Sequence, residues 1–329
     1  MSGFSGIIGH ETTIEHLKQA VVSGQVSHAY LIQGEAGTGK RTIADAFASA
    51  LQCEKGEGDA CGSCHSCRQA ASLNHPDIIH VTHEKPGSIG VDEIRAQLVN
   101  DVQIRPYNGK YKIYIVPEAE KMTAQAQNAL LKTLEEPPAY AVILLLTTNA
   151  GLLLDTIRSR CVLLNLKPVP DCQVKAWLME HLEIPDYQAD ICAAFSQGSV
   201  GRAMSLASSE NFNAIKASAM QLLNNVKDMD IYEIVAAVKN VVQYKITVHN
   251  YLDILAVWFR DVLYFKATRD VDGIILKDQL KGIRSNASTS SYEGLEMILK
   301  AIQKAKIRLD ANVNFELTME LLFLTIKEN

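Results

Sequence analysis

The stretch GEAGTGKRT, residues 34–42, comes close to a phosphate-binding loop of the pattern G-x-x-x-x-G-K-[ST]. Gly34, Gly39 and Lys40 stand at the fixed positions of that pattern, and Gly37 lies between them. In such a loop the backbone N–H groups and the following helix N-terminus face the phosphates, and the lysine reaches the outer ones. The stretch therefore has the parts that hold a phosphate group.

The same stretch lacks the hydroxyl group that ligates Mg²⁺, because Arg41 stands where the pattern has Ser or Thr. Thr42 comes one residue late, which is about 100° round a helix axis, so its hydroxyl points elsewhere. A second metal ligand is missing after the apolar run KIYIV, where Pro117 replaces the expected Asp and Glu118 follows. Two losses at one metal site predict a loop that does not hydrolyse ATP, and leave static nucleotide binding open.

Four cysteines lie within fifteen residues, namely Cys53, Cys61, Cys64 and Cys67. Thiolates at this spacing suit a tetrahedral zinc ion, and a set of four leaves no open position for catalysis. The sequence therefore predicts a structural zinc site. His65 is a competing ligand, and a reduced loop with unligated thiols is the alternative.

The composition is that of an ordinary globular protein, with 329 residues, 47% hydrophobic residues and a net charge of −5. The negative charge argues against a chain that coats nucleic acid by charge alone. Seven cysteines, an odd number, do not suit a secreted disulfide framework. The first residues have no basic start followed by an apolar run, and no apolar stretch approaches about 18 residues. We expect a cytoplasmic protein without a membrane contact.

The elements that must position these residues alternate in the first half of the chain. Helices are expected at 12–24, 41–53, 91–104 and 123–138, and strands at 29–34, 77–83, 111–116, 141–149 and 161–166. Such alternation with buried apolar strands predicts an α/β fold, a mostly parallel sheet with helices on both faces. After KPVP at 167–170 only helical patterns follow, which predicts an all-α remainder.

The turn TIRSRC, residues 156–161, completes a set of motifs with HAYLIQGEAGTGK, RPYNGKYKIYIV, NALLKTLEEPP, TTN, GSVGRAMSL and the four-cysteine insertion. With this set the whole chain resembles the clamp-loader subunits of the AAA+ class, and closely the delta-prime subunits of bacterial DNA polymerase III. The resemblance implies an AAA+ nucleotide-binding-like domain at 1–168 with a zinc module at 53–67, a small helical lid at 169–207 and a helical collar domain at 208–329. It implies gamma or tau and delta subunits as partners, and the sliding clamp and primed DNA through the assembly.

The resemblance also implies roles for single residues. Arg160, in the motif Ser159-Arg160-Cys161, corresponds to an arginine finger that acts on the ATP site of a neighbouring subunit. An arginine delivered in this way stabilises charge on the transferring phosphoryl group and needs no working site in its own chain. A surface or structural ion pair is the alternative for Arg160. Residues that match the two sensors of the family are Thr148, Asn149 and Arg202, for which we expect structural roles.

We therefore predict a clamp-loader subunit that acts as a stator in DNA replication and supplies the arginine finger without ATPase activity of its own. The alternative is an active AAA+ ATPase of the gamma or tau type, which would need Ser or Thr at 41 and Asp at 117. A zinc-containing DNA-binding module is a second alternative. The negative charge and the AAA+ order of elements argue against it.

Overall fold

The computed structural model describes residues 3–208 and 212–329, which divide into two compact units. An α/β unit runs to Trp177 and includes Gln197–Arg202, and a helical unit contains Leu178–Ser196 and Ala203–Asn329. The three predicted domains, with boundaries after 168 and after 207, stay a prediction. Residues 1–2 and 209–211, which begin the first and nearly begin the third of them, lie outside the described residues.

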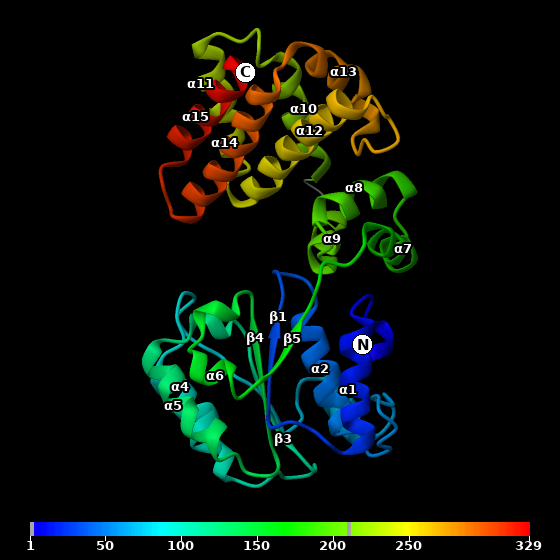
Figure 1. Cartoon of the computed structure of the whole chain (residues 1–329), viewed down its shortest axis with the longest axis vertical. Coiled ribbons are helices and arrows are strands. Elements are labelled where there is room, and N and C mark those ends of the chain that lie inside the picture. The colour runs from blue at the N-terminus through cyan, green and yellow to red at the C-terminus, as the bar shows by residue number, and fades with distance from the viewer. Residues whose placement is uncertain (1–2, 209–211) are drawn as a thin grey trace. The chain divides into compact units, whose positions relative to one another are not determined.

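The α/β unit is built on a five-stranded parallel sheet with the order β2-β3-β4-β1-β5 (Figure 1), which confirms the predicted parallel sheet. All seven residues of β4 are buried, as a central strand with both faces covered requires. The strands are β1 Ala29–Gln33, β2 Ile78–His80, β3 Lys112–Val116, β4 Ala141–Thr147 and β5 Val162–Asn165.

Helices cover both faces of this sheet, with α1 and α2 on one side and α4, α5 and α6 on the other (Figure 1). Alternate residues of β1 enter the two cores, Tyr30 and Ile32 on the side of α2, and Ala29 and Leu31 on the side of α5. The helices are α1 Glu11–Ser23, α2 Lys40–Leu51, α3 His65–Ala71, α4 Val91–Ile94, α5 Ala124–Glu135 and α6 Asp155–Arg158. Single turns are η1 Phe4–Gly6, η4 Ala119–Lys121 and η5 Ala150–Leu152.

The helix predicted at 91–104 is not one regular helix. It consists of α4, a π-helical turn η2 Arg95–Val99 and a 3₁₀ turn η3 Asp101–Gln103. Its last carbonyl oxygens accept bonds from distant side chains: Lys112 Nζ lies 2.9 Å from the oxygen of Asp101, and Tyr140 Oη lies 3.1 Å from that of Val102. These long-range bonds replace the regular helical pattern at its end.

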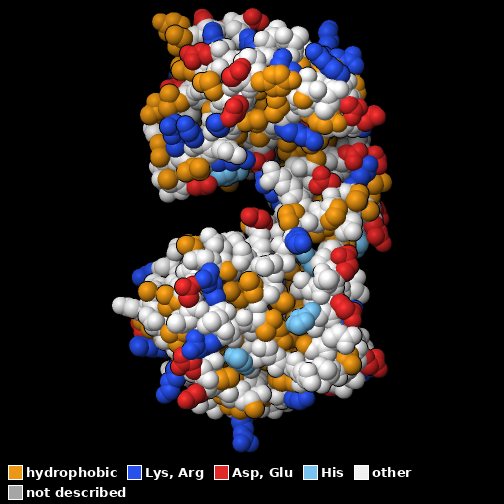
Figure 2. Space-filling view, viewed as in Figure 1, with side chains coloured by type: hydrophobic (Ala, Val, Ile, Leu, Met, Phe, Trp, Pro, Cys, Tyr) orange, Lys and Arg blue, Asp and Glu red, His pale blue; other side chains and the backbone are white. Residues whose placement is uncertain are grey.

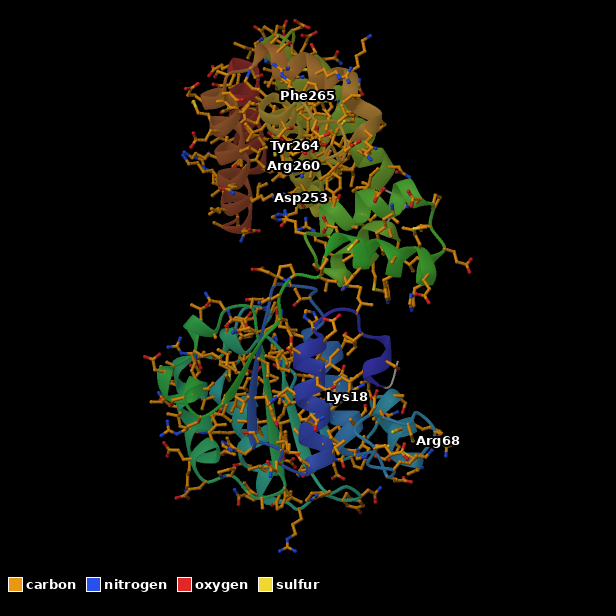
Figure 3. All side chains as sticks on the ribbon, turned by 45° about the vertical axis from the view of Figure 1, so that its right-hand side comes forward. Lys18, Arg68, Asp253, Arg260, Tyr264 and Phe265 are labelled. Atoms are coloured by element: carbon orange, nitrogen blue, oxygen red, sulfur yellow. The ribbon has the colours of Figure 1, made fainter. Side chains whose placement is uncertain are left out.

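The remaining elements are helical, as predicted: α7 Asp171–Leu182, α8 Asp186–Ser196, α9 Val200–Ala207, α10 Phe212–Asn225, α11 Ile231–Val242, η6 Lys245–Thr247, α12 Val248–Thr268, η7 Lys277–Gln279, α13 Leu280–Thr289, α14 Tyr292–Asp310 and α15 Phe315–Glu328. On α12, buried Asp253 pairs with Lys306 of α14, and Arg260 lies 5.5 Å from the ring of Tyr264 (Figure 3).

Within residues 3–208 and 212–329, no helix is long and apolar enough to cross a bilayer. On the face shown in Figure 2, Lys and Arg side chains lie among Asp and Glu side chains in both units, which matches the modest net charge.

Candidate functional site

The residues predicted to bind a nucleotide lie together at one edge of the sheet. The loop that begins at Gly34 follows β1, Pro117 follows β3, and Thr148 follows β4. Because these strands are parallel neighbours, their carboxyl ends lie together, where open α/β sheets bind ligands. Gly34 N donates to the carbonyl oxygen of Thr147 at 3.1 Å and ties the loop to the end of β4.

Lys40 bonds to the loop itself. Its Nζ donates to the carbonyl oxygen of Gly34 at 2.6 Å and to that of Glu35 at 2.7 Å. Burial lowers the pKa of Lys40, and the carboxylates of Glu120 and Glu35 oppose that shift. Gly39 precedes α2 with φ 91°, a left-handed conformation that favours glycine. The loop therefore has a defined shape in which its lysine is already engaged.

The segment around Arg202 packs directly on this loop. Gly201 N donates to the oxygen of Gly37 at 2.9 Å, and Ser199 Oγ donates to that of Ala36 at 2.9 Å. Gly37 has φ +76°, and a Cβ atom there would lie 2.4 Å from Ser199 Oγ. Burial lowers the pKa of the Arg202 guanidinium. The backbone N of Arg202 donates to Ser199 Oγ at 3.3 Å. The predicted Arg202 thus lies beside the loop, while the contact of Ser199 was not predicted.

The position expected for a metal ion is lined by basic groups. Arg41 Nε lies 3.8 Å from Asp45 Oδ2, and Asp45 Oδ1 lies 3.7 Å from His80 Nε2. Burial raises the pKa of the Asp45 carboxyl and lowers that of the His80 imidazole. A cavity of about 230 Å³ beside them is lined by Arg41, His80, Val81, Thr82, His83, Ile115 and Pro117. Mg²⁺ prefers oxygen ligands, so a guanidinium and two imidazoles make this edge unsuited to it.

Two glutamates follow β3, and the structure gives them different partners. Glu118, which we predicted at the nucleotide site, has Oε1 2.7 Å from Lys121 Nζ and Oε2 3.4 Å from His83 Nε2. Glu120 instead accepts from Thr148 Oγ1 at 2.7 Å. Burial alone would raise the pKa of Glu120, but bonds from Thr148 and its neighbours lower it. The role of Glu118 stays a prediction, and Glu120 is the carboxylate that meets the predicted sensor.

The other predicted sensor residue, Asn149, has a local structural contact. Its side chain accepts from Gly151 N at 2.9 Å and caps η5. Next to it, the buried side chain of Gln127 on α5 accepts from Leu154 N at 2.8 Å and donates to the oxygen of Met122 at 3.0 Å. These bonds hold the segment that leads into α6. Gln127 lies in the helix predicted at 123–138, but no sequence pattern marks this role.

Arg160 lies on a tight turn after α6. Its backbone N donates to the oxygen of Ile157 at 3.0 Å, and its Nη1 donates to that of Thr156 at 2.8 Å. Its Nη2 lies 2.9 Å from Glu135 Oε1 at the end of α5. Neighbouring Ser159 donates its hydroxyl to the oxygen of Thr156 at 3.2 Å. The guanidinium is about one-third exposed, so it is both positioned and accessible.

Cys161 packs against the core on the α5 side of the sheet. Burial raises the pKa of its thiol to about 12, so the thiol is protonated at neutral pH. A protonated, partly buried thiol is a poor nucleophile. In this turn Cys161 therefore contributes packing rather than reactivity.

The four predicted ligand cysteines do come together. Their sulfur atoms all lie within 4.8 Å of one another, and Cys61 Sγ is 4.0 Å from Cys67 Sγ. Metal–sulfur bonds of about 2.3 Å in a tetrahedron separate the sulfurs by about 3.8 Å, so the spacing fits a bound metal ion. Cys64 N and Cys67 N donate to the sulfurs of Cys61 and Cys64 at 3.4 and 3.3 Å, contacts that would favour thiolates at these positions.

A parallel sheet of this order with a phosphate-type loop after β1, followed by a helical unit, defines the AAA+ class. Sequence models described as "DNA polymerase III, delta subunit" and "DNA polymerase III, delta subunit, C terminal" match residues 9–170 and 209–328. The DNA polymerase III subunit delta' of Bacillus subtilis is 31% identical over 315 residues, which cover 95% of this chain and 94% of that one. The chain belongs to the delta-prime family of DNA polymerase III clamp-loader subunits.

Two further relatives are similar to this chain. The DNA polymerase III subunit delta' of Pseudomonas aeruginosa is 31% identical over 91% of each chain. The DNA polymerase III subunit tau/gamma of Haemophilus influenzae is 34% identical over 229 residues, which cover 68% of this chain and 32% of that one. The chain thus spans about a third of that longer protein.

Proposed function

We propose that the chain is the non-hydrolysing delta-prime subunit of a clamp loader and presents Arg160 to the ATP site of a neighbouring gamma or tau subunit. The observation that carries the proposal is a contrast within one unit. The metal edge has Arg41 and Pro117 in place of its ligands, whereas the turn that bears Arg160 is intact and held by bonds from α5 and α6. Loss of hydrolysis together with retention of the arginine is what a subunit acting on its neighbour needs.

In this role the loop serves as a scaffold. Lys40 bonds to loop carbonyls, and Ser199 and Gly201 pack on the same loop, which supports a fixed subunit rather than one that cycles with ATP. The predicted partners, gamma or tau and delta, and through them the sliding clamp and primed DNA, belong to this proposal. A cytoplasmic location belongs to it as well.

We further assign the four-cysteine cluster to a structural zinc ion, held by Cys53, Cys61, Cys64 and Cys67. Four thiolates satisfy tetrahedral zinc and leave no open coordination position. The bound ion would supply cross-linking of a short loop rather than catalysis.

The test is ATP turnover by the full chain alone, and then mixed with gamma or tau and delta, for wild type and Arg160→Ala. We expect no turnover by the chain alone, and turnover in the mixture that falls when Arg160 is removed. Arg158→Ala is the matched control, because Arg158 pairs with Asp155 three residues away. Turnover by the chain alone would support an active ATPase instead.

A further inference from the structure

The exposed loop Arg105–Tyr111 is held by one buried carboxylate. Asp77 is 1% exposed, and its oxygens accept from Tyr107 N at 2.6 Å, from Asn108 N at 2.8 Å and from Gly109 N at 3.0 Å. Three hydrogen bonds from backbone N–H groups to one carboxylate fix the backbone of a turn firmly. The side chain of Tyr107 at its tip is 86% exposed, so this backbone determines the shape of a surface feature.

Asp77 is held in turn by His75, which is 4% exposed. The backbone N of Asp77 donates to His75 Nδ1 at 3.1 Å, and His75 Nε2 lies 2.9 Å from Ser66 Oγ. Burial lowers the pKa of His75, so the ring is neutral near pH 7. With Nδ1 accepting, the proton lies on Nε2, which donates to Ser66. Ser66 is buried, and it directly precedes the ligand Cys67 on α3.

A second connection starts at the first ligand. Gln52, which is 5% exposed and directly precedes Cys53, donates from Nε2 to the carbonyl oxygen of Tyr111 at 2.5 Å. A Cβ atom on Gly109 would lie 1.9 Å from Gln52 Oε1, so the loop packs on this side chain as closely as glycine permits. Both connections therefore begin at residues next to cysteine ligands and end on the same loop.

We infer that the cysteine module is a brace for the loop Arg105–Tyr111, which holds its shape through Ser66, His75 and Asp77 and through Gln52 only while the module binds its metal ion. The inference rests on the metal occupancy proposed above. Ser66 and Gln52 are positioning residues in this arrangement, since neither belongs to the ligand set.

The module depends on the metal for its order. Residues 54–66 include no Leu, Ile, Val or Phe, so the module has no apolar core of its own. Gly56, Gly58 and Gly62 have φ of 65°, 86° and 68°, which are left-handed turns that favour glycine. Apart from the cysteines, the module is tied to the rest of the unit mainly by Asp59, which accepts from Phe4 N at 2.9 Å. Metal-bound loops of this kind lose their structure when the metal is removed. Release of α3 would then move Ser66 away from His75.

The test is hydrogen–deuterium exchange of the full chain under reducing conditions, zinc-loaded and after removal of Zn²⁺ with a chelator, with the zinc content measured in each sample. We expect exchange in peptide 105–111 to rise by about tenfold or more after removal, because local opening controls exchange. Peptide 124–135 of α5 should keep its rate. If the loaded sample holds one zinc ion per chain and exchange at 105–111 is unchanged after zinc removal, the brace is overturned and the zinc assignment stands.

Ser66→Ala keeps the test decisive if metal removal unfolds the whole unit. It leaves all four ligands, so the zinc content should be unchanged while exchange at 105–111 rises. Ser72→Ala is the matched control, because Ser72 lies at the end of the same helix and its hydroxyl donates within it to the oxygen of Gln69 at 3.0 Å. Equal exchange at 105–111 in the two variants would overturn the inference. Protein that binds no zinc and keeps a protected loop would overturn both this inference and the zinc assignment.

Discussion

The guanidinium of Arg160 lies 2.9 Å from the carboxylate of Glu135, so the proposed finger has an anionic partner within its own chain. The two side chains are about one-third and one-half exposed. An ion pair this exposed contributes about 0–1 kcal/mol to stability. We therefore expect that an incoming phosphate replaces Glu135 at little cost, with Glu135 as the resting partner of the arginine.

Glu135→Gln tests this view of the pair. We expect the free energy of unfolding to change by less than about 1 kcal/mol, measured by urea denaturation. ATP turnover of the mixture with gamma or tau and delta should be kept, because Arg160 remains. A loss of turnover as large as that of Arg160→Ala would contradict the resting role and show that Glu135 positions the finger.

Arg41→Thr restores the hydroxyl of the loop but leaves Pro117 without a metal ligand. We therefore expect no phosphate release above background from this variant alone, measured over many multiples of the enzyme concentration. Arg41→Ala is the control for loss of the cation without gain of the hydroxyl. Steady turnover by Arg41→Thr would mean that an Asp in place of Pro117 is not needed for hydrolysis.

Metal analysis of native protein should find about one zinc ion per chain, as a set of four thiolates binds. Cys64→Ser should lower that content and the thermal stability of the α/β unit. Cys172→Ser is the matched control, since Cys172 is exposed and lies outside the cluster. Equal zinc content in the two variants would be incompatible with the assignment.

The three cysteines outside the cluster should be alkylated at different rates at pH 8. Burial raises the pKa of Cys161 to about 12 and that of Cys192 to about 11, so little thiolate forms there. Exposed Cys172 should be labelled by iodoacetamide first, as read by peptide mass spectrometry. Labelling of Cys161 as fast as that of Cys172 would show that the SRC turn opens readily.

Acid should destabilise the α/β unit partly through His10. Burial lowers the pKa of His10, whose Nε2 donates to the oxygen of Thr38 at 3.0 Å. The unfolded chain binds this proton near pH 6.5 and the folded chain only at lower pH. The contribution to stability is therefore complete above about pH 6.5 and is lost as pH falls below it, with a slope of at most about 1.4 kcal/mol per pH unit.

His10→Asn removes this proton while keeping a residue that tolerates the left-handed backbone, since His10 has φ 61°. Urea unfolding between pH 7.5 and 5 should show a shallower slope than wild type. His16→Asn, at an exposed position on α1, should keep the wild-type slope. A slope unchanged by His10→Asn would contradict the burial argument.

The parts of the site that are local in the sequence could be predicted, and the parts that depend on tertiary contacts could not. The four cysteines lie close along the chain, so their spacing alone indicated one cluster, which the structure assembles. Strand identity followed from apolar runs, but the order β2-β3-β4-β1-β5 depends on pairing between distant segments. The ion pair of Arg160 with Glu135 on α5 likewise joins separate elements. So does the hydrogen bond from Thr148 to Glu120.

The contact between Gly37 and Ser199 has a consequence for how this loop can change in evolution. A side chain at residue 37 would collide with Ser199 Oγ at 2.4 Å, whether or not a nucleotide ever enters. The backbone conformation of residue 37 and its contact with Ser199 thus favour glycine independently of phosphate. A loop of this kind can therefore keep its glycines for packing alone, so a glycine pattern in a relative is poor evidence that the relative uses ATP.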